Sequence, residues 1–305
     1  MSKTYVISGA TGMIGRALVR NLLARGERVV ALVRQNSARA PLPAHENLSV
    51  LVCDLADYAT FVPPCKADAF LHLAWAATSG GGREDVDLQL SNIAYTLDAV
   101  RLAARFGCSV FLGAGSQAEY GIATAALTEQ TPVDPQSGYG IAKYTAGKLS
   151  RTLCRQLGIR HTWARILSIY GEQDAQTTLI MYLVRTLLAG EVPQLTPCEQ
   201  IWDYLYIEDA ASALIAIADR GRDGGVYPVG SGAPKPLAEY VRILRDAIDP
   251  TLALGFGARD YYPHQPMYLA ADITTLTNDT GFVPQTTFAD GIRSVVAAVR
   301  ESEGK

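Results

Sequence analysis

A glycine-rich turn near the start of the chain is the feature that most constrains how it folds. The segment Thr4–Ser8 has the composition of a short buried strand and leads directly into the turn Gly9-x-x-Gly12-x-x-Gly15. Apolar residues at helical spacing over residues 16–25 predict a helix that ends at Gly26, and Arg28–Val33 predicts a second strand. A strand, a tight turn, a helix and a parallel strand form the repeating unit of a doubly wound α/β sheet.

The same turn predicts a binding site for a dinucleotide. Glycines allow the backbone to turn tightly and to approach a pyrophosphate, which then rests on the exposed N–H groups at the positive end of the following helix. An ordinary turn is the alternative, but the position between a strand and a helix favours the binding site. The residues expected to contact the dinucleotide are Gly9, Thr11, Gly12, Met13, Ile14 and Gly15.

The residues after the second strand indicate which dinucleotide is bound. An acidic side chain there accepts hydrogen bonds from the ribose 2′-OH of NAD, whereas a cation accommodates the 2′-phosphate of NADP. Here Val33 is followed by Arg34, and Asn36, Ser37 and Arg39 add donors and positive charge. The sequence therefore favours NADP(H), with NAD(H) as the alternative if Arg34 is only a surface cation.

Strands and helices continue to alternate along the chain, as a parallel sheet covered on both faces requires. Residues 48–53, 69–74 and 109–113 read as further strands, and residues 88–106 read as a helix. In an open α/β sheet, ligands bind at the carboxyl ends of the strands. The candidates at those ends are Asp54 and Leu55 for the adenine edge, Trp75 in a glycine-rich loop for the substrate, and Ser116 for the crevice.

A tyrosine and a lysine four residues apart, Tyr139 and Lys143, form a candidate acid–base pair. On a helix this spacing places both side chains on one face. A tyrosine titrates near ~10, so acid or base work at neutral pH needs a neighbouring cation that favours its charged form. A solvated helix face is the alternative for the pair alone, but its context favours the catalytic interpretation.

Length and charge agree with an enzyme that acts on small molecules. The chain has 305 residues, 49% of them hydrophobic, and a formal net charge of -3. That length is enough for one large domain or two moderate ones. The nearly balanced charge gives no reason to expect nucleic acid or a membrane surface as partner. The first strand begins close to Met1, so we expect no leader segment and a cytoplasmic location.

The cysteines and histidines give no sign of a metal centre. The five cysteines are scattered without Cys-x-x-Cys spacing, and the histidines lack metal-ligand spacing. We therefore expect reduced cysteines, no disulfide framework and no metal site.

Taken together, these landmarks resemble the extended short-chain dehydrogenase/reductase family. Segments 202–210, 267–272 and 280–284 resemble its nucleotide-sugar epimerase/dehydratase/reductase branch, and the C-terminal third is similar to CDP-paratose and CDP-abequose synthases. The resemblance covers nearly the whole chain. The landmarks, in the family's order, are Gly9-x-x-Gly12-x-x-Gly15, Asp54-Leu55, His72-Leu-Ala74, Asn92, Ser116, Tyr139-x-x-x-Lys143 and Arg165-x-x-Ser168-x-Tyr-Gly171.

The resemblance implies a Rossmann-type NAD(P)-binding domain over residues 1–170 and a smaller C-terminal α/β domain over residues 171–305 that binds a nucleoside-diphosphate sugar. Tyr139 would exchange a proton with the sugar oxygen, and Ser116 would hold that oxygen. Lys143 would lower the pKa of Tyr139 and bind the nicotinamide ribose. A homodimer through two long helices is also implied. The remaining implied contacts are Leu73, Ala74 and Ile166 for the cofactor, and Trp75, Gln117, Ser168, Trp202 and Arg259 for the substrate.

Departures from the family pattern narrow the chemistry. Gln117-Ala118 stands where the dehydratases carry an Asp-Glu pair, and the cysteine of the deoxysugar epimerase/reductases is absent from this loop. Trp202 stands where the family usually has an arginine that contacts the diphosphate. Reduction of a 4-keto-deoxysugar nucleotide by NADPH and C4 epimerisation with NAD both remain, and the basic residues after the second strand favour reduction. A reductase of small non-nucleotide carbonyls and a dinucleotide sensor without turnover are further alternatives.

Overall fold

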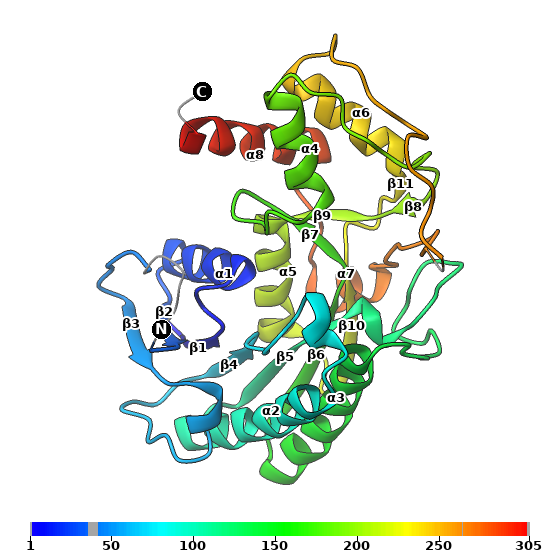
Figure 1. Ribbon diagram of the computed structural model, residues 1–305. Helices are drawn as coiled ribbons and strands as arrows, with labels where there is room; N and C mark the ends of the chain where they lie inside the picture. The colour runs from blue at the N-terminus through cyan, green and yellow to red at the C-terminus, as the bar shows by residue number, and fades with distance from the viewer. Residues whose placement is uncertain (1, 36–41, 264, 304–305) are drawn as a thin grey trace.

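Seven parallel strands form the central sheet of the computed structural model, which describes residues 2–35, 42–263 and 265–303 (Figure 1). Asn36, Ser37 and Arg39, which were expected to add donors after the second strand, lie outside the described residues. The strand order is β10-β6-β5-β4-β1-β2-β3, so the chain winds outward from β1 in both directions. The predicted doubly wound, Rossmann-type fold class is confirmed. The strands are β1 (Thr4–Ser8), β2 (Arg28–Val33), β3 (Leu48–Val52), β4 (Ala69–His72), β5 (Val110–Ser116), β6 (Arg160–Ile166) and β10 (Gly225–Val229).

Helices cover both faces of the sheet (Figure 1). α1 (Met13–Ala24) and α5 (Ile207–Arg220) pack together on one face, where their apolar residues join those of β1 and β2 in one core. α2 (Val86–Phe106) and α3 (Gly138–Leu157) pack together on the other face over a second core. The inner strands β1, β4 and β5 are buried along their whole length, whereas the edge strand β3 is partly exposed.

The C-terminal part adds a third core beside the sheet. Three helices, α4, α6 and α8, pack around it (Figure 1). Of these, α6 spans Leu237–Ile248. The elements of this part are β7 (Ser168–Tyr170) paired with β9 (Tyr204–Tyr206), β8 (Ile201–Trp202) paired with β11 (Lys235–Pro236), α4 (Leu179–Leu188), α6, α7 (Thr274–Thr280) and α8 (Phe288–Glu303).

The chain crosses between the sheet and the C-terminal helices more than once. β10 pairs with β6 at one edge of the sheet, and α5 packs on α1, although both follow residue 171 in the sequence. α7 also packs on α5 and β10. The division into domains over residues 1–170 and 171–305 stays a prediction, but the sheet draws on residues from both sides of that boundary.

Local signals set the ends of the two long helices α2 and α3. The Asp85 carboxylate accepts a hydrogen bond from Leu88 N at 3.0 Å where α2 begins, and Ser137 Oγ accepts one from Gly140 N at 3.1 Å where α3 begins. α2 ends at Gly107, which has a left-handed conformation with φ 77°. The predicted end of this helix is therefore confirmed.

β5 extends beyond its predicted end. The sequence predicts a strand that stops at Gly113, but the pairing with β6 continues to Ser116. The Trp163 side chain explains this, because a Cβ on Gly113 or Gly115 would lie 2.2 or 2.3 Å from its indole. These glycines make room for the ring and do not end the strand. Ser116 is consequently the last residue of a strand.

Within residues 2–35, 42–263 and 265–303, no helix combines the length and the apolar character needed to cross a membrane.

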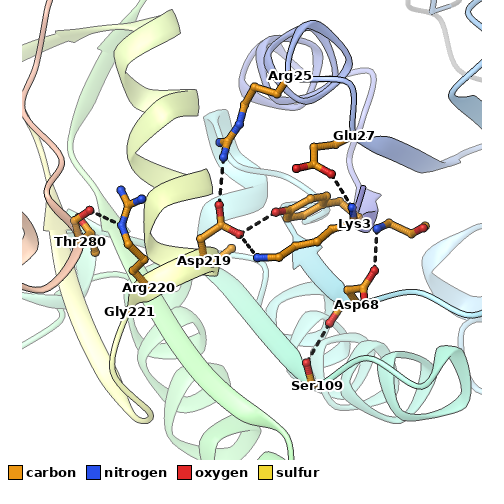
Figure 2. Close-up of polar contacts among 12 residues, drawn as sticks. Lys3, Arg25, Glu27, Asp68, Ser109, Asp219, Arg220, Gly221 and Thr280 are labelled. Atoms are coloured by element: carbon orange, nitrogen blue, oxygen red, sulfur yellow. Dashed lines mark hydrogen bonds and ion pairs between the residues drawn. The ribbon is translucent and has the colours of Figure 1, made fainter. Parts of the chain in front are cut away.

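A polar network ties the start of β1 to the end of α5 (Figure 2). The Asp219 carboxylate accepts hydrogen bonds from Lys3 Nζ at 2.8 Å and Tyr5 OH at 2.7 Å, and Arg25 Nη2 donates to it at 3.2 Å. Burial alone would raise the pKa of Asp219, but the hydrogen bonds from Lys3 and Tyr5 and the charges of Lys3 and Arg25 hold it below its ordinary value. The network lies at the amino-terminal edge of the sheet.

Asp219→Asn should lower the free energy of unfolding at neutral pH by ~1–2 kcal/mol, because the half-exposed Lys3 and Arg25 lose their counter-charge. Since the folded pKa of Asp219 lies below the unfolded one, this stabilisation is present above the ordinary carboxyl pKa and is lost as the pH falls through the folded value. The difference between variant and wild type should therefore shrink below about pH 4. Urea unfolding at several pH values measures it. Asp246→Asn, an exposed position, is the control; equal costs for both variants at neutral pH would contradict the prediction.

Candidate active site

The carboxyl ends of β1, β4 and β5 lie next to one another and carry most of the candidate residues. β1 runs into the glycine-rich turn, β4 into the loop that contains Trp75, and β5 ends at Ser116. Because all of these strands are parallel, the segments that follow them meet at one edge of the sheet. The structure therefore gathers these candidates at one edge of the sheet.

Close backbone contacts explain the glycines of the turn. A Cβ on Gly9, which has φ 71°, would lie 2.9 Å from Ala74 N, and a Cβ on Gly15 would lie 2.2 Å from Gly9 O. α1 begins at Met13, three residues before its predicted start, because Gly12 is its N-cap and the first helical turn belongs to the glycine motif. Backbone N–H groups at such a start are available to a pyrophosphate. The turn holds Gly9, Thr11, Gly12, Met13, Ile14 and Gly15.

Asp54 provides a polar atom that fits the adenine end of a dinucleotide. It follows β3, before the short 3-10 turn Leu55–Asp57. Its Oδ1 atom is buried and has no hydrogen-bond partner among the described residues. An unpaired buried acceptor is costly, and an amino group of a bound base would satisfy it. Arg34 lies exposed directly after the adjacent strand β2, where its charge is open to a bound ligand, so the residues present fit a dinucleotide across these strand ends.

Ser8 fixes the end of β4, where the cofactor contacts Leu73 and Ala74 were expected. Its Oγ accepts hydrogen bonds from Leu73 N at 3.1 Å and Ala74 N at 3.2 Å, and lies 2.8 Å from His72 Nδ1. Burial lowers the pKa of His72 to about 3, so the imidazole is neutral at physiological pH. The sequence did not single out Ser8; a polar last residue in an apolar strand was the available signal.

Tyr139 and Lys143 lie in the first turns of α3 and are buried, with 7% and 4% of their surface exposed. Lys143 Nζ donates to Ala114 O at 2.7 Å and lies 5.7 Å from the centre of the Tyr139 ring. Burial lowers the pKa of Lys143 to about 7, against the opposing charge of Glu119. Burial raises the pKa of Tyr139, and its hydrogen bond with Ser116 acts against that rise. The expected trio of Ser116, Tyr139 and Lys143 thus shares one site.

A buried carboxylate that the sequence did not reveal holds Ser116 in place. Glu119 Oε1 accepts hydrogen bonds from Ser116 N at 2.8 Å and Trp163 Nε1 at 2.9 Å, and Oε2 accepts one from Arg165 Nε at 2.7 Å. Glu119 and Arg165 are 1% and 4% exposed, so this ion pair lies out of water. The spacing Ser116-x-x-Glu119 is that of a capping box, which was the available signal.

Two side chains of the loop after β4 lie against the phenol. The Trp75 ring meets the Tyr139 ring edge-on with 6.1 Å between centroids, and Lys143 Nζ lies 3.8 Å from the centre of the indole. Arg83 Cζ lies 4.2 Å from the centre of the Tyr139 ring. The sequence predicted a role for Trp75 beside the substrate but gave no signal for Arg83, because its contact with Tyr139 depends on how the loop folds back over α3.

Gln89 and Asn92 on α2 bind this loop through side-chain hydrogen bonds. Gln89 Oε1 accepts a hydrogen bond from Trp75 Nε1 at 3.0 Å, and its Nε2 donates to Gly82 O at 2.8 Å. Asn92 Oδ1 accepts from Ala76 N at 2.9 Å, and its Nδ2 donates to Ala76 O at 3.0 Å. Both side chains are buried. The loop that carries Trp75 is therefore fixed to a helix at two points.

The other expected substrate contacts are dispersed. Trp202 Nε1 donates to Ser168 Oγ at 2.9 Å, and its half-buried ring packs against two apolar clusters. Gln117 begins the short turn after β5. Arg259 is exposed, and within the described parts of the chain no side-chain hydrogen bond joins it to Trp202 or Ser168. Ile166 ends β6.

A cavity of about 340 Å³ lies beside the glycine-rich turn. Tyr139 does not line this cavity. The candidate acid–base residues lie instead near the carboxyl ends of the strands. The lining residues of the cavity are Met13, Arg20, Glu172, Gln173, Ile207 and Glu208.

Across residues 2–35, 42–263 and 265–303, no three His, Cys, Asp or Glu side chains gather as a metal site. The cysteines are free thiols: Cys53, Cys65, Cys108, Cys154 and Cys198.

Comparison with known proteins gives a consistent family signal. A model of the NAD dependent epimerase/dehydratase family matches residues 5–230. A dTDP-glucose 4,6-dehydratase of Streptomyces griseus is 26% identical over 314 residues, which cover 97% of this chain and 94% of the relative.

Two solved structures are similar in fold. The UDP-N-acetylglucosamine 4-epimerase from Methanobrevibacter ruminantium M1, in complex with UDP-N-acetylmuramic acid, is 22% identical with a TM-score of 0.88 over 99% of both chains. The UDP-glucuronic acid 4-epimerase from Bacillus cereus, in complex with UDP-glucuronic acid and NAD, is 19% identical with a TM-score of 0.84 over 98% of this chain and 99% of that chain. At these identities the likeness shows the fold.

Glu119→Gln should lower the free energy of unfolding by roughly 3–5 kcal/mol, because Arg165 is left buried without its counter-charge. The double variant Glu119→Gln/Arg165→Met should recover part of this loss, since it removes the unpaired charge. Urea unfolding followed by circular dichroism measures both. Glu239→Gln, which breaks the exposed pair with Lys235, is the matched control and should cost less than about 1 kcal/mol. A cost for Glu119→Gln as small as that of the control would show that the buried pair does not stabilise the site.

Proposed function

We propose that this chain, which belongs to the NAD dependent epimerase/dehydratase family, is an oxidoreductase of nucleoside-diphosphate sugars with Ser116, Tyr139 and Lys143 as catalytic residues. Its net reaction is the reduction of a 4-keto-deoxysugar nucleotide, with NADPH as the hydride donor. The supporting observation is that one buried phenol, partnered by Ser116 and Lys143, lies near the carboxyl ends of the strands, while the buried carboxylate of Glu119 accepts hydrogen bonds at both of its oxygens.

The residues of the site divide the work of one proton transfer. Ser116 and Tyr139 hydrogen-bond the carbonyl oxygen of the sugar, and Tyr139 donates its proton as that oxygen gains negative charge. Lys143 stabilises the phenolate that remains, and the Ala114 carbonyl holds the ammonium in position. A bound nicotinamide dinucleotide supplies the hydride, and the protein supplies orientation and electrostatics.

The surroundings of Ser116 argue against elimination of water. Dehydration requires a further acid and base, but Gln117 and Ala118 cannot titrate. Glu119 is the next carboxylate along the chain, and both of its oxygens accept hydrogen bonds within the protein. Hydride and proton transfer without dehydration is therefore the chemistry that these residues support.

Epimerisation at C4 is the second candidate. It needs the same three side chains together with a tightly held NAD, which when bound would accept a hydride from the sugar and supply it again. The description of the family as NAD dependent favours it, whereas Arg34 after β2 favours NADP(H) and reduction.

We propose that residues on several elements bind the substrate. Trp75 and Gln117 lie on the segments that directly follow β4 and β5, so we place the sugar against them. Ser168 and Trp202, which are hydrogen-bonded to each other, would contact the rest of the nucleotide sugar. The exposed Arg259 would supply the positive charge that Trp202 lacks at the diphosphate.

Purified protein should release little bound dinucleotide and should oxidise added NADPH only when a nucleotide 4-keto-sugar is present. The keto-sugar is made in the assay by a separate 4,6-dehydratase, and the absorbance of NADPH is followed.

Tyr139→Phe is the matched variant, because it lacks the phenolic proton. We expect its kcat to be at least about a hundredfold lower, which is the usual contribution of an acid–base group, with nearly unchanged NADPH affinity. Tightly retained NAD and interconversion of two sugar epimers would favour the epimerase. Wild-type turnover in Tyr139→Phe would overturn the catalytic assignment.

We also propose that the protein is a homodimer, and we keep its cytoplasmic location as a prediction. α2 and α3 pack side by side and expose Val86 at 72%, Leu90 at 62% and Ile141 at 53%. A second copy would bury these apolar side chains. Light scattering should give twice the mass of one chain, and Leu90→Glu should shift the protein toward the monomer. Val283→Glu, at an exposed position outside both helices, is the control. A wild-type mass of one chain would exclude the dimer.

A further inference from the structure

Tyr139 faces a second cation besides Lys143. Arg83 ends the 3-10 turn Gly80–Arg83 (η2), and its Cζ lies 4.2 Å from the centre of the Tyr139 ring, whereas Lys143 Nζ lies 5.7 Å from it. We propose that Arg83 is a positioning residue that acts through Tyr139, as the permanent positive charge that stabilises its phenolate during proton transfer. This inference rests on the proposed function of Tyr139 as the proton donor.

Lys143 alone is a weak source of charge in this site. Burial lowers the pKa of Lys143 to about 7, so a large part of it is neutral at physiological pH and above. Its ammonium is also committed to Ala114 O at 2.7 Å and to the Trp75 ring at 3.8 Å. A guanidinium, in contrast, keeps its charge over the whole physiological range.

The remaining charged groups around Tyr139 do not replace Arg83. Burial is the main cause that raises the pKa of Tyr139, and the charge of Glu119 adds to it, while the charge of Arg83 acts in the opposite direction. Glu119 is a negative charge and is paired with the buried Arg165, which is committed to it. Glu84 is exposed, and its carboxylate accepts a hydrogen bond from Gly138 N. Apart from Lys143, Arg83 is thus the cation that these contacts place against the phenol.

The turn that carries Arg83 is held against the start of α3. Arg83 Nη1 donates to Thr78 O at 3.1 Å, and Glu84 Oε2 accepts from Gly138 N at 3.1 Å. Gln89 Nε2 on α2 donates a hydrogen bond to Gly82 O at 2.8 Å. Arg83 is half-buried, so its charge is screened less than that of a fully exposed arginine. The guanidinium is therefore placed by the fold of the turn.

The test measures the acidity of residue 139 directly. Difluorotyrosine, a more acidic tyrosine with only small added atoms, is incorporated at position 139, and its ionisation is followed by fluorine NMR as a function of pH. In Arg83→Met the midpoint should rise by roughly half to one pH unit, a three- to tenfold fall in the acidity constant. Arg83→Lys, which keeps a positive charge, should restore a large part of the shift. Arg293→Met on α8, which removes an exposed arginine, should leave the midpoint unchanged.

The outcomes separate this inference from the proposed function. Equal midpoints in the wild type and Arg83→Met, with both proteins folded by circular dichroism, would overturn the role of Arg83. A shift in Arg83→Lys as large as in Arg83→Met would overturn it too, because charge would then not be the cause. Failure of the protein to turn over any nucleotide sugar would overturn the proposed function. The ionisation midpoint of residue 139 would still show whether Arg83 stabilises the phenolate. With turnover, the upper limb of the pH profile of kcat should move with the NMR midpoint, and KM for NADPH should stay within about twofold.

Discussion

The removal of Tyr139 and Lys143 from water is the constraint on which the site depends. In a buried position both the phenolate and the ammonium are disfavoured, so neither charged form is available unless neighbouring groups stabilise it. The pKa of Lys143 falls and that of Tyr139 rises for this reason. The carbonyl of Ala114, the hydroxyl of Ser116 and the cation of Arg83 each offset part of that cost. Burial also strengthens their interactions with a reacting oxygen.

Support for Ser116 comes from neighbouring side chains to which we assign no part in the proton transfer. The carboxylate of Glu119 fixes the backbone of Ser116, and the ring of Trp163 fixes Glu119. Room for that ring exists because Gly113 and Gly115 carry no Cβ. The glycines of β5 and Trp163 of β6 therefore act together to hold Glu119 against Ser116. Such indirect support is common where a functional group must be held within a few tenths of an ångström.

The sequence predicted the fold better than the contacts of the site. Periodicity and glycine signals identified the strands and helices because both act over a few residues, and the spacing of Tyr139 and Lys143 fixed their common helix face. The pairing of Glu119 with Arg165 and the contact of Arg83 with Tyr139 join residues that are distant along the chain, so no local pattern encodes them. The placement of β10 in the sheet was hidden for the same reason. The roles proposed for Trp202 and Arg259 stay predictions.

The position of β10 and α5 bears on how the protein emerges from the ribosome. The edge strand β10 completes the sheet, and α5 covers the face next to α1. Both are synthesised after β7, α4, β8 and β9 of the C-terminal part. A nascent chain that ends near residue 170 exposes the apolar face of β1 and the open edge of β6. The central sheet is therefore complete only after residue 229 has been synthesised, because β10 ends there and pairs with β6.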